Sequence, residues 1–128
     1  MIDIILIQSP KSGLSLLEYR RVNTKLKKEH SEIFSGFLSA IQGISKEINI
    51  GRVNQISTEG CKAHHCIIIH EGAINVIVLM DLCDSIDYWR EKGHEIGEKF
   101  QEMFKNLMEP NNTAQFREFI PIIEKIIQ

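Results

Sequence analysis

The sequence predicts an α/β (α+β) fold in which helices cover both faces of a five-stranded, mainly antiparallel sheet, an α-β-α sandwich. The first observation is a pair of apolar runs, Cys66–Ile69 and Ile74–Met80, on either side of Glu71 and Gly72. Their spacing and β-branched content are typical of a hairpin. Both faces of these strands are apolar, so each face needs a covering layer. The second observation is that apolar residues recur at helical spacing before and after this hairpin.

Two further strands are predicted at the start of the chain. The apolar run Ile2–Gln8 ends at a turn that contains Pro10 and Gly13, and the next strand is expected over Leu14–Arg20. Because so short a connection reverses the chain, the two strands form a hairpin. The polar stretch 21–30 is expected to be a loop.

A helix is predicted from Ser31 to about Ile48, with a left-handed glycine cap at Asn49-Ile50-Gly51. Its apolar residues recur at helical spacing and are expected to face the sheet: Ile33, Phe34, Phe37, Leu38, Ile41, Ile44 and Ile48.

A line of small residues, Gly36, Ala40 and Gly43, follows the edge of that stripe. Each glycine inside a helix costs about 1 kcal/mol relative to alanine, so a compensating contact is expected. Small residues allow another backbone to approach closely. That backbone is either the protein's own sheet or another subunit.

The remaining elements complete the order β-β-α-β-β-β-α-α. A weakly apolar strand over Arg52–Thr58 is expected at a sheet edge, before the hairpin. A helix capped by Asp84 or Ser85 should run to about Met108. After a break at Pro110, Asn112 and Gln115 resemble a capping box for a last helix, which Pro121 kinks or restarts. One helix then covers one face of the sheet and two helices cover the other.

Composition indicates a single globular domain over residues 1–128. The formal net charge of −2 argues against a general nucleic-acid binder. Three cysteines without a regular framework indicate reduced thiols in a cytoplasmic protein. The first residues, Met1–Ile7, have no basic leader and are too short to span a bilayer, so no targeting or transmembrane segment is expected.

No constellation of residues indicates catalysis or a cofactor. The sequence contains no Gly-x-Ser-x-Gly, P-loop or dinucleotide-binding motif. A zinc site or an enzyme centre would have to use one cluster of thiols and imidazoles, but alternation along a strand places these side chains on different faces and argues against convergence. The cluster is Cys61, His64, His65, Cys66 and His70.

The chain resembles a longin domain of the longin and roadblock superfamily. The resemblance lies in the opening hairpin IDIILIQSPKSGLSLLEY, the helix SEIFSGFLSAIQGISKEI, the hairpin HHCIIIHEGAINVIVLMD and the amphipathic helix that follows. A strand rather than a helix at the start favours longin over roadblock. The resemblance implies a non-enzymatic platform without a cofactor. Such a platform regulates or scaffolds a small Ras-like GTPase, or is a subunit of a trafficking-like complex, for example one that acts in vesicle trafficking.

The resemblance also implies surfaces for a protein partner. We expect a homodimer, or a heterodimer with a related domain, and place the interface on the helix line or the edge strand, at Gly36, Ser39, Ala40, Gly43, Val53, Gln55 and Ser57. A basic cluster is a solvated connection or a contact for an acidic lipid or partner: Arg20, Arg21, Lys25, Lys27 and Lys28. The alternative function is a small-molecule sensor similar to PAS or profilin-like domains, with a pocket between sheet and helix.

Overall fold

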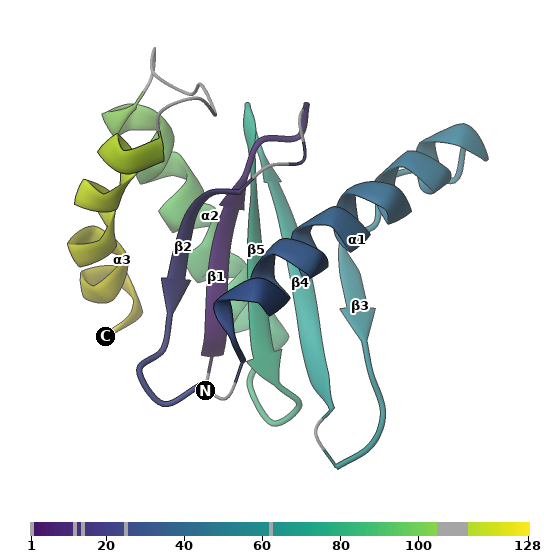
Figure 1. The fold of residues 1–128 in the computed structure, drawn as a ribbon, viewed down its shortest axis with the longest axis horizontal. Helices are drawn as coiled ribbons and strands as arrows, with labels where there is room; N and C mark the ends of the chain where they lie inside the picture. The colour runs from purple at the N-terminus through teal and green to yellow at the C-terminus, as the bar shows by residue number, and fades with distance from the viewer. Residues whose placement is uncertain (1, 12, 14, 25, 62, 105–112) are drawn as a thin grey trace.

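The computed structural model describes residues 2–11, 13, 15–24, 26–61, 63–104 and 113–128 (Figure 1). Its elements follow the predicted order, with a 3-10 helix added before the last helix. They are β1 (Ile2–Gln8), β2 (Ser15–Arg20), α1 (Lys28–Glu47), β3 (Gln55–Ser57), β4 (His64–Glu71), β5 (Ile74–Asp81), α2 (Ile86–Met103), the 3-10 helix η1 (Thr113–Phe119) and α3 (Ile120–Ile127).

The strands form one five-stranded sheet in the order β2-β1-β5-β4-β3, and every neighbouring pair is antiparallel. The predicted central hairpin is β4 with β5, paired from His64 opposite Asp81 to Glu71 opposite Ile74. Gly72 in the turn has a φ of 56°, a left-handed conformation that glycine adopts easily. β5 lies between β1 and β4, so the hairpin supplies the middle of the sheet.

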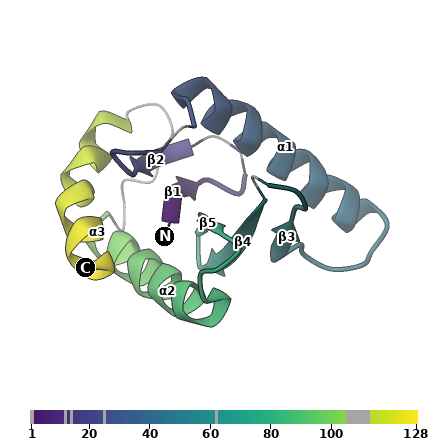
Figure 2. The ribbon, with the colours of Figure 1, turned by 90° about the horizontal axis from the view of Figure 1, so that it is seen from below.

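Both faces of the sheet are covered, with α1 on one side and α2 and α3 on the other (Figure 2). β1 shows why. Its Ile5 and Ile7 belong to the core under α2 and α3, whereas Ile4 and Leu6 belong to a smaller core under α1. The apolar character of both strand faces therefore reflects a helical layer on each side, as the sequence predicts.

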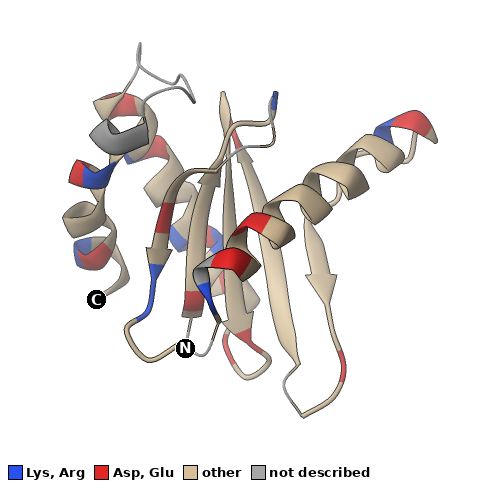
Figure 3. Ribbon diagram, in the orientation of Figure 1, with Lys and Arg blue, Asp and Glu red and all other residues tan. Residues whose placement is uncertain are grey.

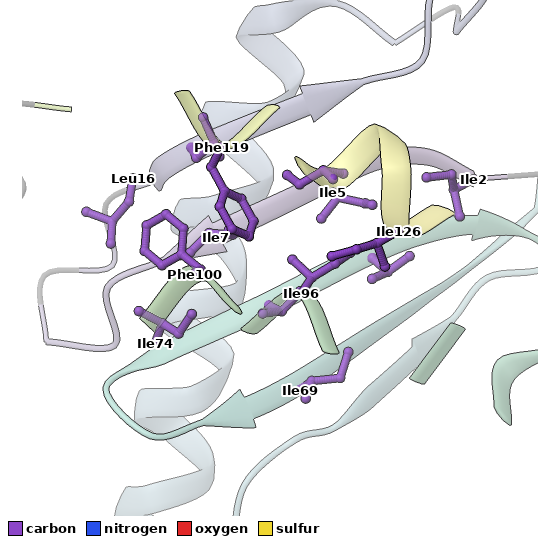
Figure 4. Packing of buried hydrophobic residues seen from close by; sticks show 14 of the residues in the cluster. Ile2, Ile5, Ile7, Leu16, Ile69, Ile74, Ile96, Phe100, Phe119 and Ile126 are labelled. Carbon is purple, nitrogen blue, oxygen red and sulfur yellow. The ribbon is translucent and has the colours of Figure 1, made fainter. Parts of the chain in front are cut away.

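The larger core is built around phenylalanine rings. The ring centroid of Phe100 in α2 lies 5.2 Å from those of Phe116 and Phe119. Phe104 lies 5.0 Å from Phe116. Tilted and edge-on ring pairs at such distances are favourable. Phe100, Phe119 and Ile96 project from the helices toward the strands, and their packing fixes α2 and α3 on this face (Figure 4).

Several element boundaries differ from the prediction. α1 begins at Lys28, so part of the expected loop is helical. The chain after α1 turns left-handed first at Asn49, with a φ of 58°, and again at the predicted Gly51, with a φ of 94°. β3 has three residues, because only Gln55–Ser57 pair with β4.

The C-terminal helices largely follow the prediction. Ser85 caps α2 by accepting a hydrogen bond from the N–H of Tyr88 at 3.2 Å. α2 ends at Met103, before the expected Met108. Residues 105–112, with the predicted break and the first half of the capping box, lie outside the described residues. Pro121 lies in the first turn of α3 and so begins a new helix, a position at which proline is well tolerated.

Charged residues lie mainly on the helices and connecting loops, and the central strands carry them only near their ends (Figure 3). No helix in the described part of the chain is long and apolar enough to cross a membrane.

Candidate functional site

The face of α1 that points away from the sheet is apolar and exposed. Ile33 is 70% exposed, Ile44 62% and Phe37 51%. This corrects the prediction that the whole apolar stripe faces the sheet, since Leu38 is the buried residue of that stripe and Phe34 is partly buried against the same core. We define the outer face of α1 as Ile33, Gly36, Phe37, Ala40, Ile44 and Ile48. Helix surface of this kind is where another molecule commonly packs.

The inner face of α1 meets the sheet through polar side chains as well as through Leu38 and the partly buried Phe34 of the smaller core. Arg20 of β2 donates to Ser31 Oγ at 2.9 Å, and Gln8 of β1 donates to Ser35 Oγ at 2.9 Å. Leu38 is the fully buried apolar residue between these contacts and the end of the helix. Because hydrogen bonds hold α1 in place, its isoleucines are free to face outward. Serines at helical spacing were the signal in the sequence that could have indicated this.

The edge strand β3 carries unpaired backbone groups. It pairs only with β4, which confirms the predicted edge position. The N–H of Thr58 donates to the carbonyl of His64 at 3.0 Å, so Thr58 faces β4. Alternation along the strand then turns the backbone groups of Gln55 and Ser57 away from the sheet. An exposed row of this kind can accept a strand from another chain.

The segment that leads into β3 is fastened to α1. The Gln42 side-chain amide donates to the Val53 carbonyl at 2.7 Å and accepts from the Val53 N–H at 3.1 Å. A side-chain amide thus satisfies the backbone groups that a neighbouring strand would otherwise bind. α1 extends past β3 at this point (Figures 1 and 2).

The small residues of α1 do not serve a contact with the protein's own sheet. A Cβ atom built on Gly36 or Gly43 would meet nothing within 4 Å. The first of the two explanations for these glycines is therefore wrong, and contact with another molecule remains a prediction. Ser39 differs from the other residues of this line because its hydroxyl accepts a hydrogen bond from Gln8 at 3.3 Å. Ala40 is exposed on the outer face of α1.

The predicted basic cluster is divided among several roles. Arg20 pairs with Glu18 at 2.8 Å, and Arg21 pairs with Asp3 at 2.9 Å. Lys27 is the N-cap residue of α1. Lys25 and the side chain of Lys28 lie outside the described residues. Contact with an acidic surface stays a prediction, to which the two arginines contribute less because they already have partners within the chain.

The thiol and imidazole cluster is dispersed over the sheet. His65 contacts Ser57 at 2.7 Å, and His70 contacts Asn75 at 2.8 Å. Cys66 is buried, which raises the pKa of its thiol to about 12. A thiol with such a pKa stays protonated at neutral pH, which makes it a weak nucleophile.

His64 instead joins an ionic cluster at the start of β1. Its Nε2 lies 2.8 Å from Asp3 and 3.5 Å from Asp81. Burial raises the pKa of Asp3, but hydrogen bonds from Arg21 and His64 outweigh it and hold this pKa below its ordinary value. Asp3, His64 and Asp81 could together ligate a cation. The guanidinium group on Asp3 opposes that, so the cluster chiefly ties three strands together.

A second group of possible ligands lies beside α2. His94 contacts Glu71 through Nδ1 and Glu98 through Nε2, the latter at 3.1 Å. His94 and Glu98 are exposed to solvent. Exposed pairs of this kind contribute little to stability and do not define a site by themselves.

No protein-family model matches this sequence, and no curated protein matches it. The structure is similar to that of MglB from Myxococcus xanthus, with a TM-score of 0.54 and 16% identity over 83% of this chain and 85% of that chain. It is also similar to a Roadblock/LC7 domain from Streptomyces avermitilis, with a TM-score of 0.55 and 12% identity over 80% of this chain and 84% of that chain. The longin and roadblock fold inferred from the sequence is confirmed.

Proposed function

We propose that this chain, acting as one domain, is a non-enzymatic protein-interaction module that assembles through the outer face of α1 and the edge of β3. The observation that carries the proposal is the exposed set of Ile33, Phe37 and Ile44 on α1 beside an open strand edge. Full burial of such a side chain contributes about 1.5–3 kcal/mol relative to exposure, so covering this surface is favourable.

The favoured assembly is a homodimer, or a heterodimer with a related domain. Two copies of β3 placed side by side across a two-fold axis would extend the sheet and satisfy the outward backbone groups of Gln55 and Ser57. The same axis would bring two outer faces of α1 together. Gly36 and Ala40 would then allow the two helices to approach closely.

The fold suggests a class of further partner. Longin and roadblock domains resemble one another in being platforms for small GTPases and trafficking complexes, and the two similar structures include a Roadblock/LC7 domain. We therefore propose that the assembled chain regulates or scaffolds a small Ras-like GTPase, or serves as a subunit of a trafficking-like complex. A cytoplasmic location is part of this proposal.

Strand addition can be tested with a proline at the edge. Gln55→Pro removes an N–H that points away from β4, so we expect the fold to remain and self-association to weaken in sedimentation velocity. Ile56→Pro is the matched control. Its N–H faces β4, so this change should lower the free energy of unfolding instead. Self-association of Gln55→Pro equal to that of the unchanged chain would rule out strand addition.

The GTPase proposal has its own test. Purified Ras-like GTPases from the same organism, loaded with GDP or a GTP analogue, should co-elute with the chain in at least one nucleotide state, and their rate of GTP hydrolysis should change. If no GTPase co-elutes and every hydrolysis rate is unchanged, the GTPase part of the proposal fails and the assembly part is unaffected.

A further inference from the structure

A hollow of about 660 Å³ opens between the C-terminal half of α1 and the end of the sheet at which β1 and β4 finish. Its walls come from four separate segments: the β1–β2 turn, α1, the loop before β3 and the β4–β5 hairpin. Pockets for small ligands commonly measure about 300–1,000 Å³, so the hollow has a suitable size.

The charged residues that line this hollow are all basic in the described part of the chain. Lys11 comes from the β1–β2 turn, Lys46 from the last turn of α1 and Arg52 from the loop before β3. None of these three forms an ion pair with a described residue, and no described acidic residue lines the hollow. The whole chain has 17 acidic and 15 basic residues, so the exclusion of acids here runs against its composition. Unpaired cations around a concave surface concentrate the field and attract anions.

The floor of the hollow is polar. Gln8 and Asn75 are buried, and the His70 ring lies beside them with its Nδ1 2.8 Å from Asn75 Oδ1. The Gln8 amide already donates to Ser35 and the His70 ring contacts Asn75, so these groups chiefly make the surface polar and disfavour an apolar ligand.

The helical wall of the hollow is uncovered at Gly43. A Cβ atom there would meet nothing within 4 Å, so no contact within the chain accounts for a glycine in mid-helix. Gly51 on another wall has a φ of 94°, a left-handed conformation that favours glycine. The backbone there therefore carries no side chain. Both positions leave backbone open to a bound molecule.

We propose that this hollow binds a small, multiply charged anion of the polyphosphate or polycarboxylate class. Lys11, Lys46 and Arg52 would neutralise its charge, and the planar guanidinium of Arg52 is suited to bind two oxygen atoms at once. The proposal goes beyond the interaction function, because it assigns a ligand to a different side of α1. It also gives the sensor alternative a specific location between sheet and helix.

The test is isothermal titration of the full chain at low ionic strength with two probes, pyrophosphate and citrate. Binding of pyrophosphate alone assigns a phosphate ligand, and binding of citrate alone assigns a carboxylate ligand. Lys46→Gln and Arg52→Gln should each weaken binding about tenfold, since each removes one charged contact. Lys99→Gln on the exposed side of α2 is the matched control and should leave the affinity unchanged.

Two outcomes would overturn the proposal. One is that neither probe binds the unchanged chain. The other is that Lys46→Gln and Arg52→Gln bind as tightly as Lys99→Gln. Lys46 and Arg52 are exposed, so circular dichroism should show both variants folded. Ile44→Glu, designed to block assembly, should keep the affinity, whereas loss of binding in that variant would contradict a site held by a single chain.

Discussion

Replacement of Ile44 by glutamate should separate assembly from folding. Full burial of an isoleucine side chain contributes about 1.5–3 kcal/mol. Ile44 is 62% exposed in the single chain, so its remaining surface would contribute about 1–2 kcal/mol when a second copy covers it. A two-fold contact includes this residue twice, which gives about 2–4 kcal/mol. At 1.4 kcal/mol for each tenfold change, we expect Ile44→Glu to raise the dissociation constant roughly 30- to 700-fold.

Sedimentation velocity over a concentration series measures this change directly. Val22→Glu is the matched control, because Val22 is 97% exposed outside α1 and its replacement also puts a glutamate in place of a β-branched aliphatic side chain. Both variants should keep the free energy of unfolding of the isolated chain within about 0.5 kcal/mol, since neither side chain is buried. Equal dissociation constants for Ile44→Glu and Val22→Glu would refute the assignment of the outer face of α1 as an interface, as would an unchanged chain that stays monomeric at high micromolar concentration.

Four further predictions concern the fold itself. Gly43→Ala should raise the free energy of unfolding by about 1 kcal/mol, because alanine favours a helix. Gly97→Ala should lower it by about 1 kcal/mol, because the new Cβ would lie 2.8 Å from Glu71 Cγ; urea denaturation that shows both variants equally stabilised would contradict this packing. The pKa of Asp3 is held below its ordinary value of 3.8, so its stabilisation is complete above that pH and is lost as the pH falls through the folded pKa. In urea denaturation at a series of pH values, Asp3→Asn should lose less of its free energy of unfolding at acid pH than the unchanged chain does. Parallel pH dependences for the two proteins would count against the assigned ion pairs. Cys66 is buried with a pKa raised to about 12, so a thiol reagent should label the two exposed cysteines in the native protein and Cys66 only after denaturation.

The layered fold could be predicted because its signal is local. The β-branched run Ile74–Met80 is apolar on both strand faces, and that pattern requires two covering layers wherever the strand lies. Ser85 and Pro121 act within one turn of their own helices, so their capping and helix-starting roles could be predicted as well.

The orientation of α1 could not be predicted in the same way. Periodicity shows that Ile33, Phe37 and Ile44 share a face, but it does not say whether that face meets the sheet or a partner. The greater hydrophobicity of this stripe favoured the sheet. Contacts such as Gln8 with Ser35 decide otherwise, and they join residues far apart in the chain.

The edge strand was predictable, since its weak apolar pattern reflects a position beside only one neighbour. The basic hollow was not. Its cations lie in three segments that are far apart in the sequence, and only the fold brings them to one end of the sheet.

The two hydrogen bonds between the Gln42 side chain and the Val53 backbone connect α1 directly to the segment that leads into the edge strand. A molecule bound to α1 therefore lies on an element that is hydrogen-bonded to the segment leading into the strand edge. One side-chain amide thus fixes the spacing between the two surfaces that the proposed assembly would use.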